Sequence, residues 1–383
     1  MIVGLTLAAL LASFLAPPLY AGAMLAILVV LLSLRGVRIS PPLVPGTGII
    51  IAMFLTFAGF AILGPILNYG VGGRNIDALK FIFATASLAI GFILGVEQGR
   101  LSRLVPVLIA MLALVYGFLY VTEGELSQES LLYPPDNNHS ASMLGVLLPV
   151  IVLRTKGALR IACLVMLAAF AFFAASRALL ALTLLAAALS SKTVREQRAM
   201  MVATVALAGA ILFYQGFSMD NFSDRLRLQI LEVSLHFAQT RGAYAFNFGE
   251  AAFSDYLNIY PIYQRLEIQH AHNILLQVWV AYGIVPFAFF AIFLVTFFGF
   301  GLRQRNTMFL AAFTIFMALG MMEAIITDIR ALGTIMLALG YTYSRGSVLG
   351  RGDLDLDDGP ATRPVPGPTA RSAPPPVHVG VTR

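Results

Sequence analysis

The sequence predicts an all-α, polytopic membrane protein in which about twelve transmembrane helices are joined by loops. Two observations predict this class. Of the 383 residues, 59% are hydrophobic and only 11% are charged, whereas a soluble globular chain carries about 25% charged residues. Long uncharged apolar stretches also recur along the chain, and a membrane-spanning helix needs about 20 apolar residues. This composition excludes a soluble enzyme, a DNA-binding protein and a disordered chain.

Apolar stretches broken by charged residues or by proline and glycine locate the expected spans. The first stretch lacks a basic leading region and a small-residue cleavage site, so we expect a span there and not a cleaved signal peptide. Together the spans form a transmembrane domain over 1–345. The tail over 346–383 holds seven prolines and few large apolar residues, which predicts disorder. We expect helices over 2–16, 20–34, 47–67, 77–96, 104–121, 140–153, 161–175, 178–191, 199–215, 272–300, 307–326 and 329–345.

The positions of lysine and arginine predict the orientation. Twelve of these residues lie in alternate loops, where only Glu97 and Glu196 oppose them: Arg35, Arg38, Arg100, Arg103, Arg154, Lys156, Arg160, Lys192, Arg195, Arg198, Arg303 and Arg305. The positive-inside rule places these loops and both termini in the cytoplasm, so the long segment 216–271 faces outward. The net charge of +6 therefore reflects topology and does not indicate binding to nucleic acid.

Arg177 lies between two apolar stretches on the expected outer side. An arginine at membrane depth costs about 2.5–3.5 kcal/mol on insertion scales, and such a residue is a candidate functional group by default. The alternative is an arginine at a helix end whose charged head reaches the membrane surface.

Part of the outer segment 216–271 has the pattern of an amphipathic helix. Ser223 can cap its start and Gly242 can end it. One face carries apolar residues and another carries polar ones at helical spacing: Leu226, Ile230, Val233 and Phe237 against Arg225, Gln229, Glu232 and His236. Two arrangements fit this pattern, namely a helix on or in the outer membrane surface and a lid helix docked on the bundle.

A second outer cluster precedes the span expected over 272–300. It contains Arg265, His270, His272 and Asn273, and Arg241 lies earlier in the same segment. Histidine can accept or relay a proton near pH 7, and arginines hold phosphate through forked, charge-assisted bonds. The alternatives are structural histidines, or a metal site for which a third and fourth ligand are missing. We expect neither a metal nor another cofactor.

Two smaller outer-side groups complete the candidates. Asp328 and Arg330, with Glu323 nearby, form either an ion pair that makes burial tolerable or part of a site. Asn138 and His139 open another span, where the asparagine can simply cap the helix.

Arginines and histidines on one surface, beside an amphipathic segment, match a substrate with a lipid tail and a phosphorylated head. Arginine charge would stabilise a departing pyrophosphate while a histidine deprotonates an incoming hydroxyl. The competing class is a transporter or flippase, in which the same charges line a pathway for an anionic or lipid-linked substrate. Composition does not separate the two classes.

The outer motifs resemble those of the O-antigen ligase and O-antigen polymerase superfamily. The resemblance covers roughly residues 137–330 and rests on the order and spacing of four short motifs. These are Asn138-His139-Ser140-Ala141, Ser176-Arg177-Ala178, Asp224-Arg225-Leu226, and His272-Asn273 followed by Tyr282-Gly283.

The resemblance implies a C-type glycosyltransferase fold with one periplasmic loop of short helices, in the bacterial inner membrane and with its active site facing the periplasm. It implies transfer from an undecaprenyl-pyrophosphate-linked glycan to a sugar hydroxyl, on a lipid A core for a ligase or on another glycan for a polymerase. Arg177 and Arg225 would bind the pyrophosphate, and His272 would act as the acceptor base or position the acceptor. Arg241, Arg265, His270, Asn273, Asn138 and His139 are expected to contact substrate.

Overall fold

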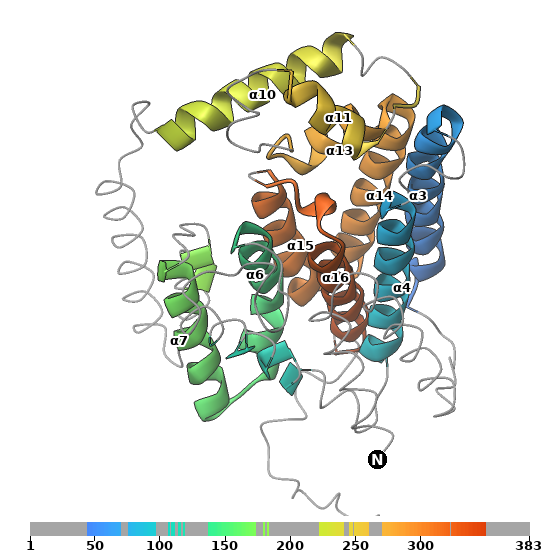
Figure 1. Cartoon of the computed structure of the whole chain (residues 1–383). Coiled ribbons are helices and arrows are strands. Elements are labelled where there is room, and N and C mark those ends of the chain that lie inside the picture. The colour runs from blue at the N-terminus through green and yellow to red at the C-terminus, as the bar shows by residue number, and fades with distance from the viewer. Residues whose placement is uncertain are drawn as a thin grey trace, which may run out of the picture.

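All secondary structure in the described part of the computed structural model is helical (Figure 1). The helices are α3 (Thr47–Tyr69), α4 (Ile76–Val96), α6 (Asn137–Arg154), α7 (Gly157–Phe173), α10 (Phe222–Thr240), α11 (Glu250–Leu257), α13 (Ile274–Tyr282), α14 (Ile284–Arg303), α15 (Thr307–Gly320), the 3-10 turn η1 (Ile325–Thr327) and α16 (Ile329–Leu349). The structure describes residues 44–69, 76–96, 137–173, 222–240, 245–259 except 248, 270–349 except 322, and a few residues within 106–118 and 179–183.

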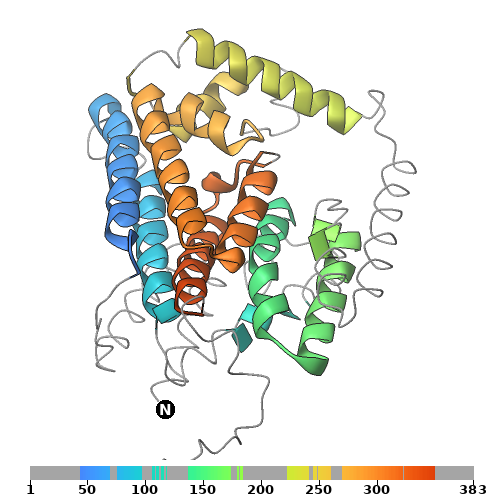
Figure 2. The same ribbon diagram turned by 180° about the vertical axis from the view of Figure 1, so that it is seen from behind.

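The longer helices form a bundle (Figures 1 and 2). Of those described, α3, α4 and α14 are long and apolar enough to cross a bilayer, while α6, α7 and α15 are shorter apolar helices. These helices indicate a membrane protein, whereas the number of about twelve spans stays a prediction. The helices expected over 2–16, 20–34 and 199–215 lie outside the described residues, and those over 104–121 and 178–191 are described only in part.

Helices α3 and α14 pack side by side through three pairs of aromatic rings. Residue numbers rise along α3 as they fall along α14, so the two helices are antiparallel. The ring centroids are 5.0 Å apart for Phe54 and Phe293, 4.9 Å for Phe57 and Phe290, and 4.9 Å for Phe60 and Phe289.

Helices α4 and α16 approach each other at glycine residues. A Cβ atom at Gly91 would lie 2.3 Å from the carbonyl oxygen of Leu337, and one at Gly340 would lie 2.5 Å from that of Leu88. Small residues allow such close contact between membrane helices, which is held by van der Waals packing. Any side chain at these positions would push the two backbones apart.

Two of the arginines predicted to face the cytoplasm lie at one end of the bundle. Helices α6 and α14 end at Arg154 and Arg303 on one side, and α10, α11 and α13 lie at the opposite end (Figure 1). The described ends of α6 and α14 therefore lie away from the described helices of the segment 216–271, while the side of the membrane that each end faces stays a prediction. We call the end that carries α10, α11 and α13 the outer end.

The single span expected over 272–300 is wrong, because the chain forms two helices that meet at Gly283. Gly283 has φ 99° and ψ 178°, a conformation open almost only to glycine. Residues 245–249 run beside this break and donate to the carbonyl groups of the last turn of α13. Those bonds join Asn247 Nδ2 to Val280 O at 2.9 Å, Gly249 N to Ala281 O at 2.8 Å and Asn247 N to Tyr282 O at 2.9 Å.

Substitution of Gly283 by alanine is expected to destabilise the fold by about 1–3 kcal/mol from backbone strain alone. A Cβ atom there would also lie 2.8 Å from Ala245 O, which adds to the cost. The sole cysteine, Cys163, is buried, so its labelling by a thiol reagent during heating measures unfolding. Gly157→Ala is the control, because Gly157 also has a positive φ of 59° but open space around it. If Gly283→Ala and Gly157→Ala lower the stability equally, the close approach of residues 245–249 to Gly283 adds nothing to the cost.

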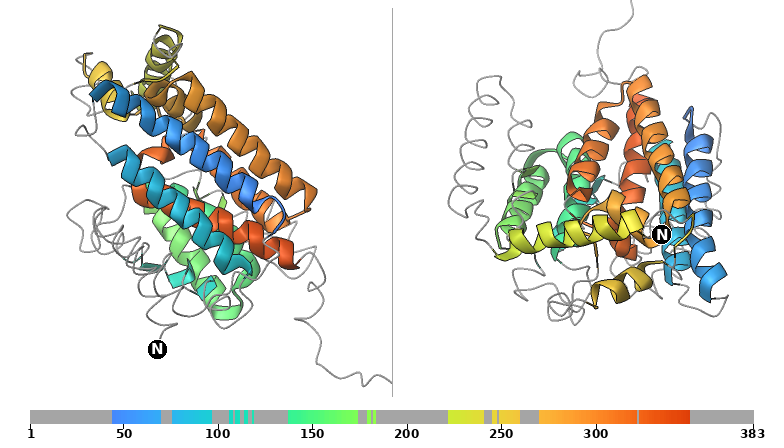
Figure 3. Two further views of the ribbon diagram at one scale, coloured as in Figure 1. Left: turned by 90° about the vertical axis from the view of Figure 1, so that its right-hand side faces the viewer. Right: turned by 90° about the horizontal axis from the view of Figure 1, so that it is seen from above.

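Helix α10 lies across the outer end of the bundle (Figure 3) and confirms the predicted amphipathic pattern. Ile230 and Phe237 are buried against residues of α11 and α13, with Leu226 and Val233 partly buried beside them. The polar face is exposed at Arg225, Glu232 and His236. The helix is therefore docked on the bundle, which is one of the two predicted arrangements, while its contact with the membrane surface stays a prediction. It begins at Phe222, one residue before the expected cap Ser223, and the expected stop Gly242 lies outside the described residues.

Helix α16 continues to Leu349, four residues beyond the expected boundary at 345. The remainder of the tail lies outside the described residues.

Candidate functional site

The chain between α15 and α16, residues 321–328, lies at the outer end and is the centre of the candidate site. The span expected over 307–326 ends early, at Gly320, and the chain then forms the turn η1 before α16 begins. We call these residues the 321–328 connection. Two of the predicted site histidines contact it.

The first is His272, whose ring meets an acidic side chain of the connection. Its Nδ1 atom lies 3.3 Å from Glu323 Oε2, with side-chain exposures of 29% and 13%. A carboxylate that accepts the Nδ1 proton leaves Nε2 unprotonated in the neutral ring, so Nε2 can accept a proton from another group. The pair therefore has the arrangement of a histidine base oriented by a carboxylate.

The backbone of His272 is strained, because its φ is 50°, in the left-handed region that non-glycine residues rarely adopt. The next residue, Asn273, caps α13, since its side chain accepts from Leu276 N at 3.0 Å. Asn273 Nδ2 also donates to Met321 O at 3.3 Å. Asn273 thus ties the start of α13 to the 321–328 connection, and its contact with substrate stays a prediction.

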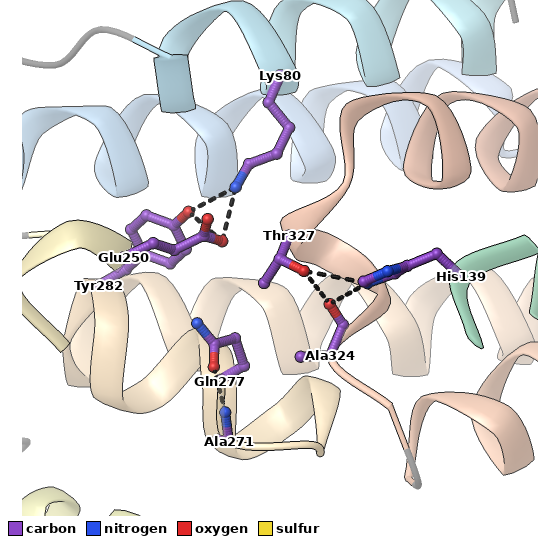
Figure 4. Close-up of polar contacts among 8 residues, drawn as sticks. All are labelled: Lys80, His139, Glu250, Ala271, Gln277, Tyr282, Ala324 and Thr327. Carbon is purple, nitrogen blue, oxygen red and sulfur yellow. Dashed lines mark hydrogen bonds and ion pairs between the residues drawn. The ribbon is translucent and has the colours of Figure 1, made fainter. Parts of the chain in front are cut away.

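The second histidine is His139, which lies in the first turn of α6 and is buried. Its Nε2 atom lies 3.1 Å from Thr327 Oγ1 and 3.4 Å from Ala324 O (Figure 4). Glu323 and Ala324 are consecutive residues, so the structure brings His139 and His272 to neighbouring points of one short segment. These contacts hold α6 against the connection.

Asp328 and Arg330 form an ion pair, as one of the two sequence interpretations predicted. Arg330 Nη2 lies 3.2 Å from Asp328 Oδ2. Asp328 Oδ1 also accepts from the backbone nitrogens of Arg330 and Ala331, each at 2.8 Å, and so caps α16. Both residues stabilise the start of this helix.

The other predicted residues divide into two groups. Arg225 is exposed near the start of α10, and His270 is half-buried two residues before His272. Asn138 lies in the first turn of α6, where only its backbone is described. Arg177, Arg241 and Arg265 lie outside the described residues.

A buried polar cluster at the outer end was missed from the sequence. Lys80 Nζ lies 2.6 Å from Glu250 Oε1 and 3.2 Å from the hydroxyl of Tyr282, which itself donates to Glu250 Oε1 at 3.0 Å (Figure 4). The three residues come from α4, α11 and α13, so the cluster joins the outer segment to the bundle. We call it the Lys80 cluster.

One signal in the sequence could have indicated the Lys80 cluster. Lys80 is the single charged residue of the apolar stretch 78–96, and it lies near the expected outer end of that span. An ionisable residue inside a membrane span is functional or paired. Its partner could not be found in the same way, because Glu250 is 170 residues away.

Within the described part of the chain, no three His, Cys, Asp or Glu side chains gather closely enough to hold a metal ion. A search of family models gives no match to this chain, and no curated protein matches it.

Proposed function

We propose that this protein transfers a glycan from a polyprenyl-pyrophosphate lipid to a sugar hydroxyl at the outer face of the membrane, as an O-antigen ligase or a surface polysaccharide polymerase of the bacterial inner membrane. The observation that carries the proposal is the pair His272 and Glu323 at the outer end of an apolar bundle. Support also comes from the resemblance of the motifs around Asn138, Arg177, Arg225 and His272 to that superfamily.

In the proposed reaction, His272 Nε2 takes the proton from the acceptor hydroxyl. The acceptor oxygen forms a bond to the anomeric carbon of the donor as the bond from that carbon to the pyrophosphate oxygen breaks. The pyrophosphate leaves with the electron pair of that bond, and Glu323 stabilises the imidazolium that forms. The products are a new glycosidic bond and undecaprenyl pyrophosphate.

Arginine has the geometry and permanent charge needed to hold the leaving pyrophosphate. Arg177 and Arg225 are assigned this role by their motifs, with Arg241, Arg265 and His270 as further contacts to the substrate. The exposed position of Arg225 on α10 leaves its side chain accessible to a ligand at the outer end.

The test uses purified protein in nanodiscs with an undecaprenyl-pyrophosphate-linked repeat unit as donor. We expect release of undecaprenyl pyrophosphate together with a longer or transferred glycan. Arg177→Ala should lower this release about 10²-fold, as expected for loss of one group that stabilises developing charge. If the parent protein binds the donor but never releases undecaprenyl pyrophosphate, the proposal is wrong.

The acceptor is tested in a deletion strain, because both reactions share the same donor chemistry. A ligase predicts that polymer disappears from lipid A while long lipid-linked chains accumulate. A polymerase predicts that single repeat units remain on the lipid or on the core.

The Lys80 cluster favours a second candidate function, a transporter or flippase for an anionic or lipid-linked substrate. Buried ionisable residues in membrane bundles mark transport pathways. Lys80 lies in the second turn of α4, near the outer end and not in the middle of the span, and for this reason we prefer the transferase. Movement of a fluorescent lipid-linked glycan across liposomes, without product formation, would support the transporter instead.

A further inference from the structure

We infer that Gln277 is a positioning residue for His272, an assignment that rests on the proposed function. Gln277 lies in the first turn of α13 and its side chain is fully buried. It would act on the reaction only through the backbone that carries the imidazole ring.

The contact that supports this role is a hydrogen bond inside the protein. The backbone nitrogen of Ala271 donates to Gln277 Oε1 at 2.8 Å, and both groups are buried (Figure 4). A buried backbone N–H group needs an acceptor. Here the acceptor is a side chain that folds back from the helix to the residue just before His272.

His272 needs such support because its left-handed backbone conformation is unfavourable for a histidine. A strained residue persists only where the residues around it hold it in place. Gln277 holds the N-terminal side of His272 through Ala271 N, and Asn273 holds the other side by capping α13. Between these two anchors the ring is directed to Glu323.

The two polar atoms of the Gln277 amide differ in their contacts. Oε1 accepts the Ala271 bond, whereas Nε2 is buried and has no hydrogen-bond partner among the described residues. The role therefore requires the acceptor oxygen and not the NH2 group. Gln277→Glu retains such an oxygen, because a carboxyl group buried there without a cationic partner binds a proton and stays neutral. Gln277→Leu removes the acceptor.

The experiment compares these two variants in the full-length protein. Diethylpyrocarbonate labels accessible imidazoles, and mass spectrometry separates the label on His272 from that on His236, which is exposed on α10. For Gln277→Leu we expect His272 to label at least about 5-fold faster and glycan transfer to fall about 10²-fold, the size typical of a displaced catalytic group. His236 labelling and the heating profile of Cys163 should match those of the parent. Gln277→Glu should restore both readouts to near the parent values.

Two results would overturn the inference: unchanged His272 labelling in a folded Gln277→Leu variant, or a Gln277→Glu variant that has the parental heating profile of Cys163 but otherwise behaves like Gln277→Leu. Hydrogen exchange on the parent protein covers the case in which Gln277→Leu does not fold. The Ala271 amide should then exchange at least about 10²-fold more slowly than an unstructured amide, and free exchange would disprove the bond. Labelling and hydrogen exchange need no turnover. They therefore test the role of Gln277 even if the protein does not catalyse the proposed reaction.

Discussion

Replacement of His272 by alanine is expected to lower glycan transfer about 10²–10⁴-fold, the usual contribution of a general base. The variant loses the ring nitrogen that would take the proton from the acceptor hydroxyl. Binding of the donor should change little, because the pyrophosphate is assigned to the arginines. The measurement is release of undecaprenyl pyrophosphate in a single turnover by purified protein in nanodiscs.

Two further variants make this result specific. Arg303→Ala removes an exposed charge at the opposite end of the bundle and should transfer glycan at nearly the parental rate. Glu323→Gln keeps the shape of the side chain that meets His272 Nδ1 but removes its charge, so we expect a smaller loss than for His272→Ala. Parental transfer by His272→Ala would exclude His272 as the base.

Substitution of Lys80 by methionine is expected to destabilise the protein by about 3–5 kcal/mol, the cost of breaking a buried ion pair by removing one partner. The side chains of Lys80 and Glu250 are 2% and 14% exposed. Without the lysine, the Glu250 carboxylate stays largely buried and loses its cationic partner, while the Tyr282 hydroxyl still donates to it. The loss should appear as a lower temperature at which Cys163 becomes accessible to a thiol reagent.

A double variant separates the charge from the packing. Lys80→Met combined with Glu250→Gln removes both charges and should recover part of the lost stability. Lys156→Met is the matched control, because Lys156 is exposed at the opposite end of the bundle, and it should change stability by no more than about 0.5 kcal/mol. If Lys80→Met unfolds at the same temperature as Lys156→Met, the Lys80 cluster does not stabilise the outer segment.

Features set by neighbouring residues could be predicted. The faces of α10 follow from apolar residues at helical spacing, and the Asp328–Arg330 pair follows from a separation of two residues. Each of these depends on contacts or periodicity within one short stretch of chain.

The features that the sequence did not predict depend on contacts between residues far apart in the chain. Hydropathy predicted one span over 272–300 because it does not detect a change of backbone conformation inside an apolar stretch. The break at Gly283 depends on residues 245–249, which supply hydrogen-bond donors to α13. Glu323 is likewise 51 residues from His272, so its meeting with the ring depends on how α13 and the 321–328 connection pack.

The sequence by itself determined that this is a helical membrane protein and where several of its spans lie, and it predicted which side chains could carry out transfer from a lipid pyrophosphate. Composition and charge suffice to assign the membrane helices, because a bilayer favours apolar spans and basic cytoplasmic loops however the helices pack against one another. Only the tertiary structure decided that Glu323 orients His272, that Gln277 holds the strained turn before α13, and that Glu250 neutralises Lys80 inside the protein. Such pairings arise from the three-dimensional packing of distant helices, which leaves no short-range pattern along the chain.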